Sequence, residues 1–175
     1  MADFKKYFPT LVKWEGAAFT NTPGDAGGPT KYGVILTEWK AKGWDKDGDK
    51  DIDVNDLKLI TADDAAGIAK AHYWDKLKAD NINNQSIAEF LVDFAYNCGV
   101  STAAKKIQGV LGITADGVIG PGSLKSINEA NQEQLFNNLK AKRESYYRAI
   151  VANKPSQSKF LKGWLNRNNS FHFKN

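Results

Sequence analysis

Residues 14–34 read WEGAAFTNTPGDAGGPTKYGV, and this stretch decides how the N-terminal part of the chain folds. Upstream of it, apolar residues recur at the spacing of one helix face, and Glu15 is the next position on that face. The spacing predicts a helix from Asp3 to Glu15, with Asp3 as its N-cap and Gly16 at its end. Because residues 16–33 hold five glycines and two prolines, they are predicted to form an irregular loop with room for a short hairpin.

Glu15 is unusual on the apolar side of a helix, because burying a carboxylate is costly and raises its pKa. The carboxyl end of a helix would raise that pKa further, since the helix dipole disfavours negative charge there. A carboxylic acid that keeps its proton near neutral pH suits general-acid cleavage of a glycosidic bond. Glu15 is therefore a candidate general acid, and a structural glutamate that binds loop amides is the alternative. Asp25 in the loop either faces a sugar or a water, or accepts hydrogen bonds from the loop backbone.

The composition is that of a folded protein of ordinary size. Of its 175 residues, 42% are hydrophobic and 25% are charged, which is typical of one globular domain or of two small lobes sharing a core. The net charge of +4 favours an anionic partner such as a bacterial envelope but is too small to indicate nucleic acid binding. No apolar run is long enough to span a membrane, and the first residues contain no signal-peptide core. The single cysteine, Cys98, excludes an intramolecular disulfide and is predicted to be a buried thiol.

Helical periodicity continues through most of the chain. Capping boxes at Thr61–Asp64 and Ser86–Glu89 predict the start of two helices, and Gly99 is predicted to end the second. Asp93 and Asn97 stand four residues apart in that helix, on a face away from its apolar stripe. The helices predicted after the first cover about residues 36–42, 61–77, 86–98, 101–111, a short segment after 123, 132–152 and 160–165. The sequence thus predicts an all-α, or nearly all-α, protein.

Residues 45–56 read DKDGDKDIDVND, which is similar to the twelve-residue calcium loop of an EF-hand. Aspartates occupy the odd positions from one to nine, an isoleucine occupies position eight, and an aspartate closes the loop. These carboxylates repel one another unless a cation neutralises them, and an acidic solvated loop is the alternative. Lys50 stands where position six requires glycine, which predicts a strained turn, and Asp56 shortens the closing bidentate arm. The predicted ligands of a structural calcium ion are Asp45, Asp47, Asp49, Asp51 and Asp56.

Several segments carry a family resemblance. From Glu15 onward the chain follows the pattern E-G-x-x-F-x-N-x-P-x-D-x-G-G-x-T-x-Y-G-V. Further segments are AHYWD at 71–75, DFAYNCG at 93–99, LGITADGVIGP at 111–121 and FLKGWLNR at 160–167. Together they resemble glycoside hydrolase family 108, the lysozyme-like N-acetylmuramidases of phages and bacteria, and the later part resembles the peptidoglycan-binding module that accompanies this family. One departure is Ala17, where the family usually has a second glycine after the glutamate.

This resemblance implies both a fold and the roles of several residues. The fold is mainly α, a lysozyme-like helical domain with a glycine-rich active-site loop, into which the EF-hand-like calcium loop is inserted. The implied division is a catalytic lobe at 1–88 and a helical peptidoglycan-binding lobe at 89–175 that shares its core. Glu15 is implied as the catalytic acid, Asp25 is the weaker candidate for a second carboxylate, and catalysis needs no cofactor. The residues expected to bind the glycan are Thr30, Tyr32, Asp93 and Asn97.

The expected function is hydrolysis of the β-1,4 bond between N-acetylmuramic acid and N-acetylglucosamine in bacterial peptidoglycan. The alternatives are a lytic transglycosylase acting on the same bond, a catalytically silent peptidoglycan-binding module, and a calcium-dependent adhesion or assembly domain. We expect a monomer that binds peptidoglycan, does not bind nucleic acid and does not insert into a membrane. Lacking a signal peptide, an endolysin made in the cytoplasm from a phage or prophage gene would reach the wall through a holin or a dedicated secretion route.

Overall fold

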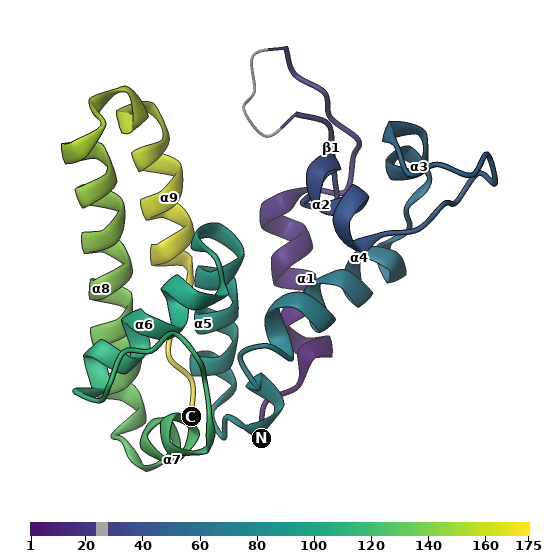
Figure 1. Cartoon of the computed structure of the whole chain (residues 1–175). Helices are drawn as coiled ribbons and strands as arrows, with labels where there is room; N and C mark the ends of the chain where they lie inside the picture. Colours follow the sequence, from purple (N-terminus) through teal and green to yellow (C-terminus); the bar gives the residue numbers. More distant parts are fainter. Residues whose placement is uncertain (24–27) are drawn as a thin grey trace. The chain divides into compact units, whose positions relative to one another are not determined.

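The computed structural model describes residues 1–23 and 28–175, and the described part is mainly helical, as the sequence predicts (Figure 1). It forms two compact units, of which one is Lys5–His72 and the other combines Met1–Phe4 with Tyr73–Asn175. Within the part of the chain that is described, no helix is both long and apolar enough to cross a bilayer.

Helix α1 (Phe4–Glu15) is the predicted N-terminal helix, and Asp3 directly precedes it. Pro9 lies inside the helix, beyond its first turn, where the missing N–H cannot bond to the carbonyl of Lys5. Burial of the stripe that includes Tyr7 and Leu11 holds the helix in place despite this loss.

The unit Lys5–His72 continues after α1 with a small antiparallel hairpin. Strand β1 (Thr30–Lys31) pairs with β2 (Val34–Ile35), which confirms a hairpin near the end of the glycine-rich stretch. The helices that follow are α2 (Leu36–Lys42), α3 (Val54–Leu59) and α4 (Ala62–Ala69), which runs on into the π-helical segment η1 (Lys70–Trp74). The buried core of this unit consists of Val34, Trp39, Leu57, Ile60, Ala65 and Ile68.

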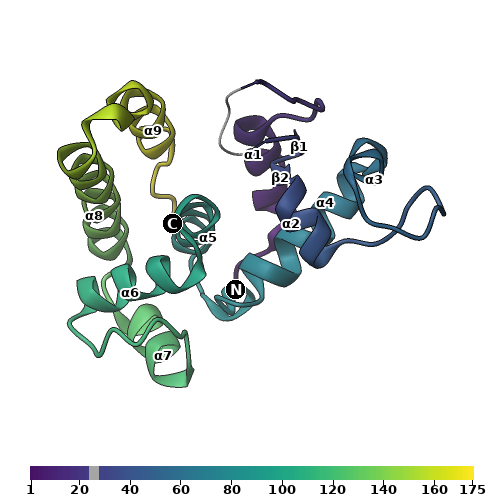
Figure 2. The same ribbon diagram turned by 45° about the horizontal axis from the view of Figure 1, so that its top comes forward.

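The unit that contains Tyr73–Asn175 is a bundle built around aromatic side chains. Helices α8 and α9 pack along each other, α5 packs against α6 and α8, and α7 packs against α6 and α8 (Figures 1 and 2). The elements of this unit are η2 (Ala79–Asn81), α5 (Gln85–Cys98), α6 (Val100–Leu111), α7 (Pro121–Glu129), α8 (Gln132–Asn153), η3 (Pro155–Gln157) and α9 (Ser158–Ser170). Its buried aromatic residues include Phe90, Phe94, Phe136, Tyr147 and Phe171.

The start of α5 differs from the prediction. The N-cap is Asn84, whose side chain accepts a hydrogen bond from the backbone N–H of Ile87 at 3.1 Å. Ser86 is therefore inside the first turn, and its hydroxyl accepts a hydrogen bond from the backbone N–H of Lys174 at 2.9 Å instead. The predicted Ser86 cap was wrong because a better acceptor stands two residues earlier. Gly99, with φ +89°, ends α5 as predicted.

The Cys98 thiol lies half-buried at the end of α5. Burial raises the pKa of this thiol to about 12, so it stays protonated at neutral pH. Since the thiolate is the reactive form, Cys98 has a packing role and no part in the chemistry discussed below.

Candidate active site

Glu15 is the last residue of α1, and its side chain is half-buried against the hairpin turn. Gly16 follows with φ +80°, a conformation that glycine adopts without strain, so the chain leaves the helix axis at once. A Cβ atom built on Gly33 would lie 2.7 Å from both Cβ and Cγ of Glu15. Gly33 therefore lies directly against the aliphatic part of the glutamate, and no larger residue fits between them. The structure brings together the two ends of the segment that carries the family pattern.

The turn of the hairpin consists of Tyr32 and Gly33, and Lys31 pairs with Val34 on either side of it. The two turn residues have φ values of +50° and +78°, as a type I′ hairpin turn requires. A non-glycine residue such as Tyr32 pays roughly 1–2 kcal/mol for the left-handed conformation. Its ring packs against the buried core of the unit, and the Nζ of Lys31 lies 5.9 Å from the ring centre. Core packing thus fixes a strained residue next to Glu15, and such strain is typical of functional sites.

Thr30 shapes the end of the glycine-rich loop. Its backbone exchanges two hydrogen bonds with Thr20, of 2.8 and 2.9 Å, and its hydroxyl donates to the carbonyl oxygen of Gly28 at 3.1 Å. These bonds close the loop that contains the second predicted carboxylate. Asp25 itself lies outside the described residues, and sugar contacts by Thr30 and Tyr32 stay predictions.

We expect Gly33→Ala to lower glycoside hydrolase activity by about 10²-fold, because the new Cβ atom would displace Glu15, and a misplacement of about 1 Å has an effect of that size. The strain of a non-glycine residue at φ +78° would add a loss of stability. Clearing of a cell-wall suspension measures the rate, and circular dichroism measures the melting temperature. Gly109→Ala is the control, because a Cβ there meets no atom within 4 Å. A Gly33→Ala protein with wild-type clearing would show that this contact does not position the glutamate.

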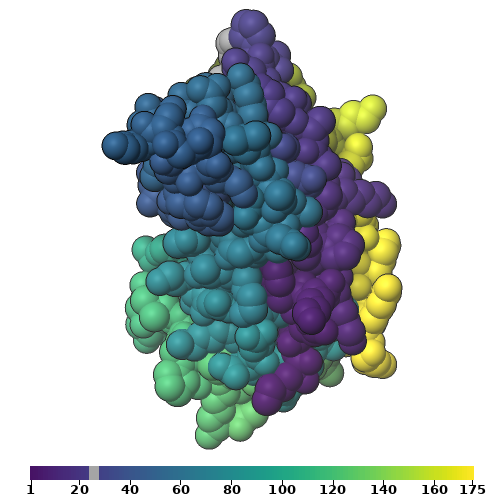
Figure 3. Space-filling model, turned by 90° about the vertical axis from the view of Figure 1, so that its right-hand side faces the viewer, coloured from purple at the N-terminus to yellow at the C-terminus, as the bar shows by residue number. Residues whose placement is uncertain are grey.

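The acidic loop at 45–56 projects from the surface of the unit Lys5–His72 (Figures 1 and 3). Asp45 accepts hydrogen bonds from the backbone N–H groups of Gly48 at 2.6 Å and Lys50 at 2.9 Å. Gly48 and Lys50 have φ values of +85° and +77°, so Lys50 adopts the conformation for which an EF-hand loop uses glycine, and the predicted strain is confirmed. Ile52, at the eighth position of the loop, packs against the buried core of the unit.

The carboxylates of this loop gather into two groups. Within each group the oxygen atoms lie within 4.8 Å of one another, and the groups are Asp45, Asp47 and Asp49, and Asp51, Asp53 and Asp56. Desolvation, together with the charges of Asp49 and Asp56, raises the pKa of Asp47. Asp56 is buried and accepts hydrogen bonds from the N–H groups of Asp53 at 2.7 Å, Lys46 at 2.5 Å and Asp47 at 3.3 Å, which lower its pKa. Hydrogen bonds to backbone N–H groups therefore fix the shape of the loop, and this shape holds carboxylates that repel one another.

Asp93 lies in α5, inside the unit that contains Tyr73–Asn175, where its side chain is fully buried. Two arginines bind its carboxylate, Arg143 from α8 at 2.8 Å and Arg167 from α9 at 2.7 and 2.9 Å. Burial alone would raise the pKa of Asp93, but the guanidinium groups of Arg167 and Arg143 hold it below its usual value. Asp93 is therefore an ionised bridge between three helices, and its burial argues against a direct contact with a glycan.

Asn97 is exposed in the last turn of α5, one helical turn beyond Asp93. Its side-chain oxygen accepts hydrogen bonds from Arg143 at 2.5 Å and from the hydroxyl of Tyr147 at 3.0 Å. Arg143 is further enclosed by the rings of Phe90, Phe94, Tyr147 and Phe171, which lie 5.2 to 6.0 Å from its guanidinium carbon. The amide thus closes the network at its exposed end, and a sugar contact by Asn97 remains a prediction.

Sequence reasoning did not identify Gly33, Arg143 or Arg167. A weak signal for Gly33 was present, because a type I′ turn needs positive φ, which glycine adopts readily, although Tyr32 stands where such turns prefer asparagine, aspartate or glycine. The arginines gave no such signal, since charged residues in a helical pattern are normally on its solvated face.

Comparisons with known proteins show the family of the chain and a protein of similar fold. The family model described as Glycosyl hydrolase 108 matches residues 8–99, and the model described as Predicted Peptidoglycan domain matches residues 102–169. Among solved structures, SagA of Brucella abortus has a similar fold, with a TM-score of 0.72 and 24% sequence identity over 96% of this chain and 94% of that one. The curated protein sequences gave no match. The chain belongs to the glycosyl hydrolase 108 family, and it is a glycoside hydrolase whose second matched region points to peptidoglycan as its substrate.

Proposed function

We propose that the chain hydrolyses the β-1,4 bond between N-acetylmuramic acid and N-acetylglucosamine, with Glu15 as the general acid. The observation that carries the proposal is the position of Glu15, which is half-buried at the end of α1 and fixed against Gly33. This glutamate lies inside the region that matches the glycosyl hydrolase 108 family. A carboxyl group held by rigid backbone can deliver a proton to a leaving oxygen without losing its orientation.

In this mechanism Glu15 protonates the oxygen that leaves the anomeric carbon. Positive charge then develops on the ring, and a carboxylate or a positioned water is needed on the other side of the sugar. Asp25 is the proposed second group, either stabilising that charge or orienting the water. Thr30 and Tyr32, at the end of the same loop, are proposed to hold the sugar through their hydroxyl groups. No metal or cofactor enters this scheme.

The products distinguish hydrolysis from lytic transglycosylation on the same bond. We expect fragments with a reducing N-acetylmuramic acid end, because a second carboxylate such as Asp25 favours attack by water. Transglycosylation uses the 6-hydroxyl of the sugar instead and leaves an anhydro ring that is lighter by one water. Mass spectra of digested, purified peptidoglycan measure the difference. Anhydro products alone would exclude hydrolysis while leaving the role of Glu15 intact, and binding without any products would indicate a silent binding module.

We also propose that residues 1–88 form the catalytic lobe and that residues 89–175 bind peptidoglycan. The match at 102–169 supports the second assignment. On this proposal the protein acts as a monomer on the cell wall, after export through a holin or a dedicated secretion route. Sedimentation of the purified protein with cell walls of defined composition would test the binding assignment separately from catalysis.

We propose that the acidic loop binds one Ca²⁺ ion with a structural role. The first carboxylate group and the two positive φ values at Gly48 and Lys50 support this, because both follow the EF-hand pattern. Within each of the two carboxylate groups, a spacing of up to 4.8 Å between oxygen atoms fits the 2.3–2.6 Å ligand distances that calcium needs. The proposed ligands are Asp45, Asp47, Asp49, Asp51 and Asp56. Asp56 would bind the ion only through lone pairs that its three backbone bonds leave open.

Removal of calcium is expected to lower the melting temperature, and added calcium is expected to restore it by ligand linkage. Magnesium should restore it poorly, because a flexible loop rich in carboxylates suits the larger ion. Asp47→Asn is a more specific test, because it removes one of the carboxylates that repel one another. In chelator, its melting temperature should equal or exceed that of the wild type. Added calcium should then fail to raise it. A melting curve that neither chelator nor calcium moves would identify the segment as an acidic loop only.

A further inference from the structure

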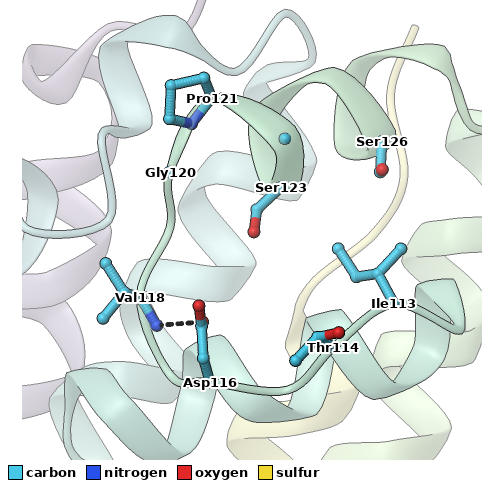
Figure 4. Close-up of a pocket in the computed structure, with 9 residues that line it drawn as sticks. Ile113, Thr114, Asp116, Val118, Gly120, Pro121, Ser123 and Ser126 are labelled. Carbon is cyan, nitrogen blue, oxygen red and sulfur yellow. Dashed lines mark hydrogen bonds between the residues drawn. The ribbon is translucent and has the colours of Figure 1, made fainter.

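A pocket of about 390 Å³ opens in the unit that contains Tyr73–Asn175, between the loop that follows α6 and the start of α7 (Figure 4). The close-up shows the side chains of Asp116, Ser123 and Thr114 around the same opening. The complete lining consists of Ile113, Thr114, Asp116, Val118, Gly120, Pro121, Gly122, Ser123 and Ser126. This pocket lies within the region that matches the Predicted Peptidoglycan domain, far along the chain from Glu15.

Gln108, a buried residue of α6, holds the walls of the pocket in place. Its amide nitrogen shares two hydrogens among three acceptors, a carboxylate oxygen of Asp116 at 2.8 Å, the carbonyl oxygen of Val118 at 3.0 Å and the hydroxyl oxygen of Ser123 at 3.1 Å. Its amide oxygen accepts from the backbone N–H of Gly117 at 3.0 Å. One buried side chain thus ties the loop to α7, so the pocket is preformed and does not depend on a ligand for its shape.

The charge inside the pocket comes from Asp116. One carboxylate oxygen, Oδ1, accepts hydrogen bonds from the N–H of Val118 at 2.9 Å and from Gln108 at 2.8 Å. These two bonds lower the pKa of Asp116, so the group is ionised at neutral pH. In the described part of the chain its other oxygen, Oδ2, is assigned no hydrogen bond, and the pocket lining contains no lysine, arginine or histidine to neutralise it. No side chain of the lining therefore neutralises the exposed carboxylate of Asp116, although the first backbone N–H groups of α7 also face this pocket.

The other residues of the lining indicate which chemical group the pocket can bind. The hydroxyl groups of Thr114, Ser123 and Ser126 can accept hydrogen bonds beside the carboxylate. A carboxylate-bearing ligand would be repelled, and the lining has no aromatic ring on which a sugar could stack. The ligand group that fits is a cationic donor of small size. A primary ammonium group has three donors and a positive charge, and it meets this description.

We propose that this pocket binds a primary ammonium group of peptidoglycan, with Asp116 as its counter-ion. The proposal rests on the proposed function, in that peptidoglycan is the partner. Two parts of the polymer can supply this chemistry: the free amine of the diamino acid in the stem peptide, and the amine of a sugar that has lost its acetyl group. Binding here anchors the enzyme at uncrosslinked stems or at deacetylated sugars.

The experiment uses the full chain carrying Glu15→Gln, so that the probes are not cleaved, and measures affinity by calorimetry. The probes are a disaccharide tripeptide with a free diaminopimelate amine, the same compound with that amine acetylated, the disaccharide without peptide, and a glucosamine disaccharide. Acetylation of the amine is expected to weaken binding by about tenfold or more, because it removes a charged hydrogen bond. Tight binding of the glucosamine disaccharide would assign the sugar as the source, and tight binding of the tripeptide would assign the stem.

Asp116→Asn supplies the matching change in the protein. The amide oxygen can still accept the bonds from Val118 and Gln108, so the loop should keep its shape while the charge is lost. We expect the same tenfold loss of affinity for the amine, with an unchanged melting temperature. Glu129→Gln at the other end of α7 is the control, because it removes an exposed carboxylate of the same helix.

Equal affinity for the free and acetylated stem amines, together with no gain for the glucosamine disaccharide over the acetylated disaccharide, would overturn the inference, even if Asp116→Asn proved unstable. This failure is distinct from failure of the proposed function. Digestion products with reducing ends would persist if only the ammonium site were wrong. Conversely, amine-dependent binding would persist in a chain that turned out not to hydrolyse the glycan.

Discussion

Glu15→Gln is expected to reduce the rate of peptidoglycan hydrolysis by about 10²–10⁴-fold, the usual contribution of general acid–base catalysis. Glutamine keeps the length of the side chain and its contact with Gly33, but it has no proton to give to the leaving oxygen. Because packing is retained, the melting temperature should stay at the wild-type value. Release of reducing ends from purified peptidoglycan measures the rate, and sedimentation with cell walls checks that binding is kept.

Two controls make this result specific. Glu38→Gln removes a carboxylate from α2, where it pairs with Lys42 at 2.8 Å, and it should leave the rate unchanged. Asp25→Asn should lower the rate by less than Glu15→Gln, in keeping with a supporting role. If the Glu15→Gln protein folds normally and releases reducing ends at the wild-type rate, another residue must donate the proton.

Asp93→Asn is expected to have the largest effect on stability, about 3–5 kcal/mol of the free energy of unfolding. The reason is that Arg143 and Arg167 are both largely buried, and their charges would lose the carboxylate that neutralises them. Urea unfolding followed by circular dichroism measures the loss. Glu144→Gln is the matched control, since it breaks an exposed pair with Arg148 on α8, and such pairs contribute about 0.2–1 kcal/mol.

The same ion pairs predict how stability depends on pH. Because the pKa of Asp93 is lowered in the folded protein, its contribution is fully present above the unfolded-state pKa of about 3.9. The contribution is then lost as pH falls through the lower, folded-state pKa. We expect Asp93→Asn to remove this part of the acid destabilisation, so the gap between variant and wild type should narrow in strong acid. A constant gap across the acid range, or a loss as small as that of Glu144→Gln, would contradict the bridging role of Asp93.

Elements whose signal is local could be predicted from the sequence. The helix at Leu36–Lys42, the capping box of Thr61 with Asp64 and the glycine end of α5 all agree with the structure. Each depends on residues within four positions of one another, where propensity and capping act directly. Ser86 failed as a cap for the same local reason, since the helix starts two residues earlier, where the Asn84 side chain caps the N–H of Ile87.

In the candidate site, only features encoded by neighbouring residues could be predicted from the sequence. Glu15 follows from its position at the end of an apolar helix stripe, and the strain at Lys50 follows from the spacing of the acidic loop. The contact of Glu15 with Gly33 and the burial of Asp93 depend on how distant segments pack. The sequence of α5 alone predicts a solvent-exposed Asp93. The arginines that neutralise its charge lie 50 and 74 residues further along the chain, so the helix itself carries no sign of them.

The salt bridges of Asp93 connect the two regions of the chain that match different family models. Asp93 belongs to the sequence region that matches the hydrolase family, whereas Arg143 and Arg167 belong to the region that matches the peptidoglycan domain. The two inherited modules therefore meet in a shared buried salt bridge, and the boundary drawn by sequence does not coincide with a boundary in the fold. A chimera that joins residues 102–169 to an unrelated hydrolase must also transplant α5, or two buried arginines will have no counter-ion. In this chain, α5 and the region 102–169 are therefore one structural unit for any exchange of modules.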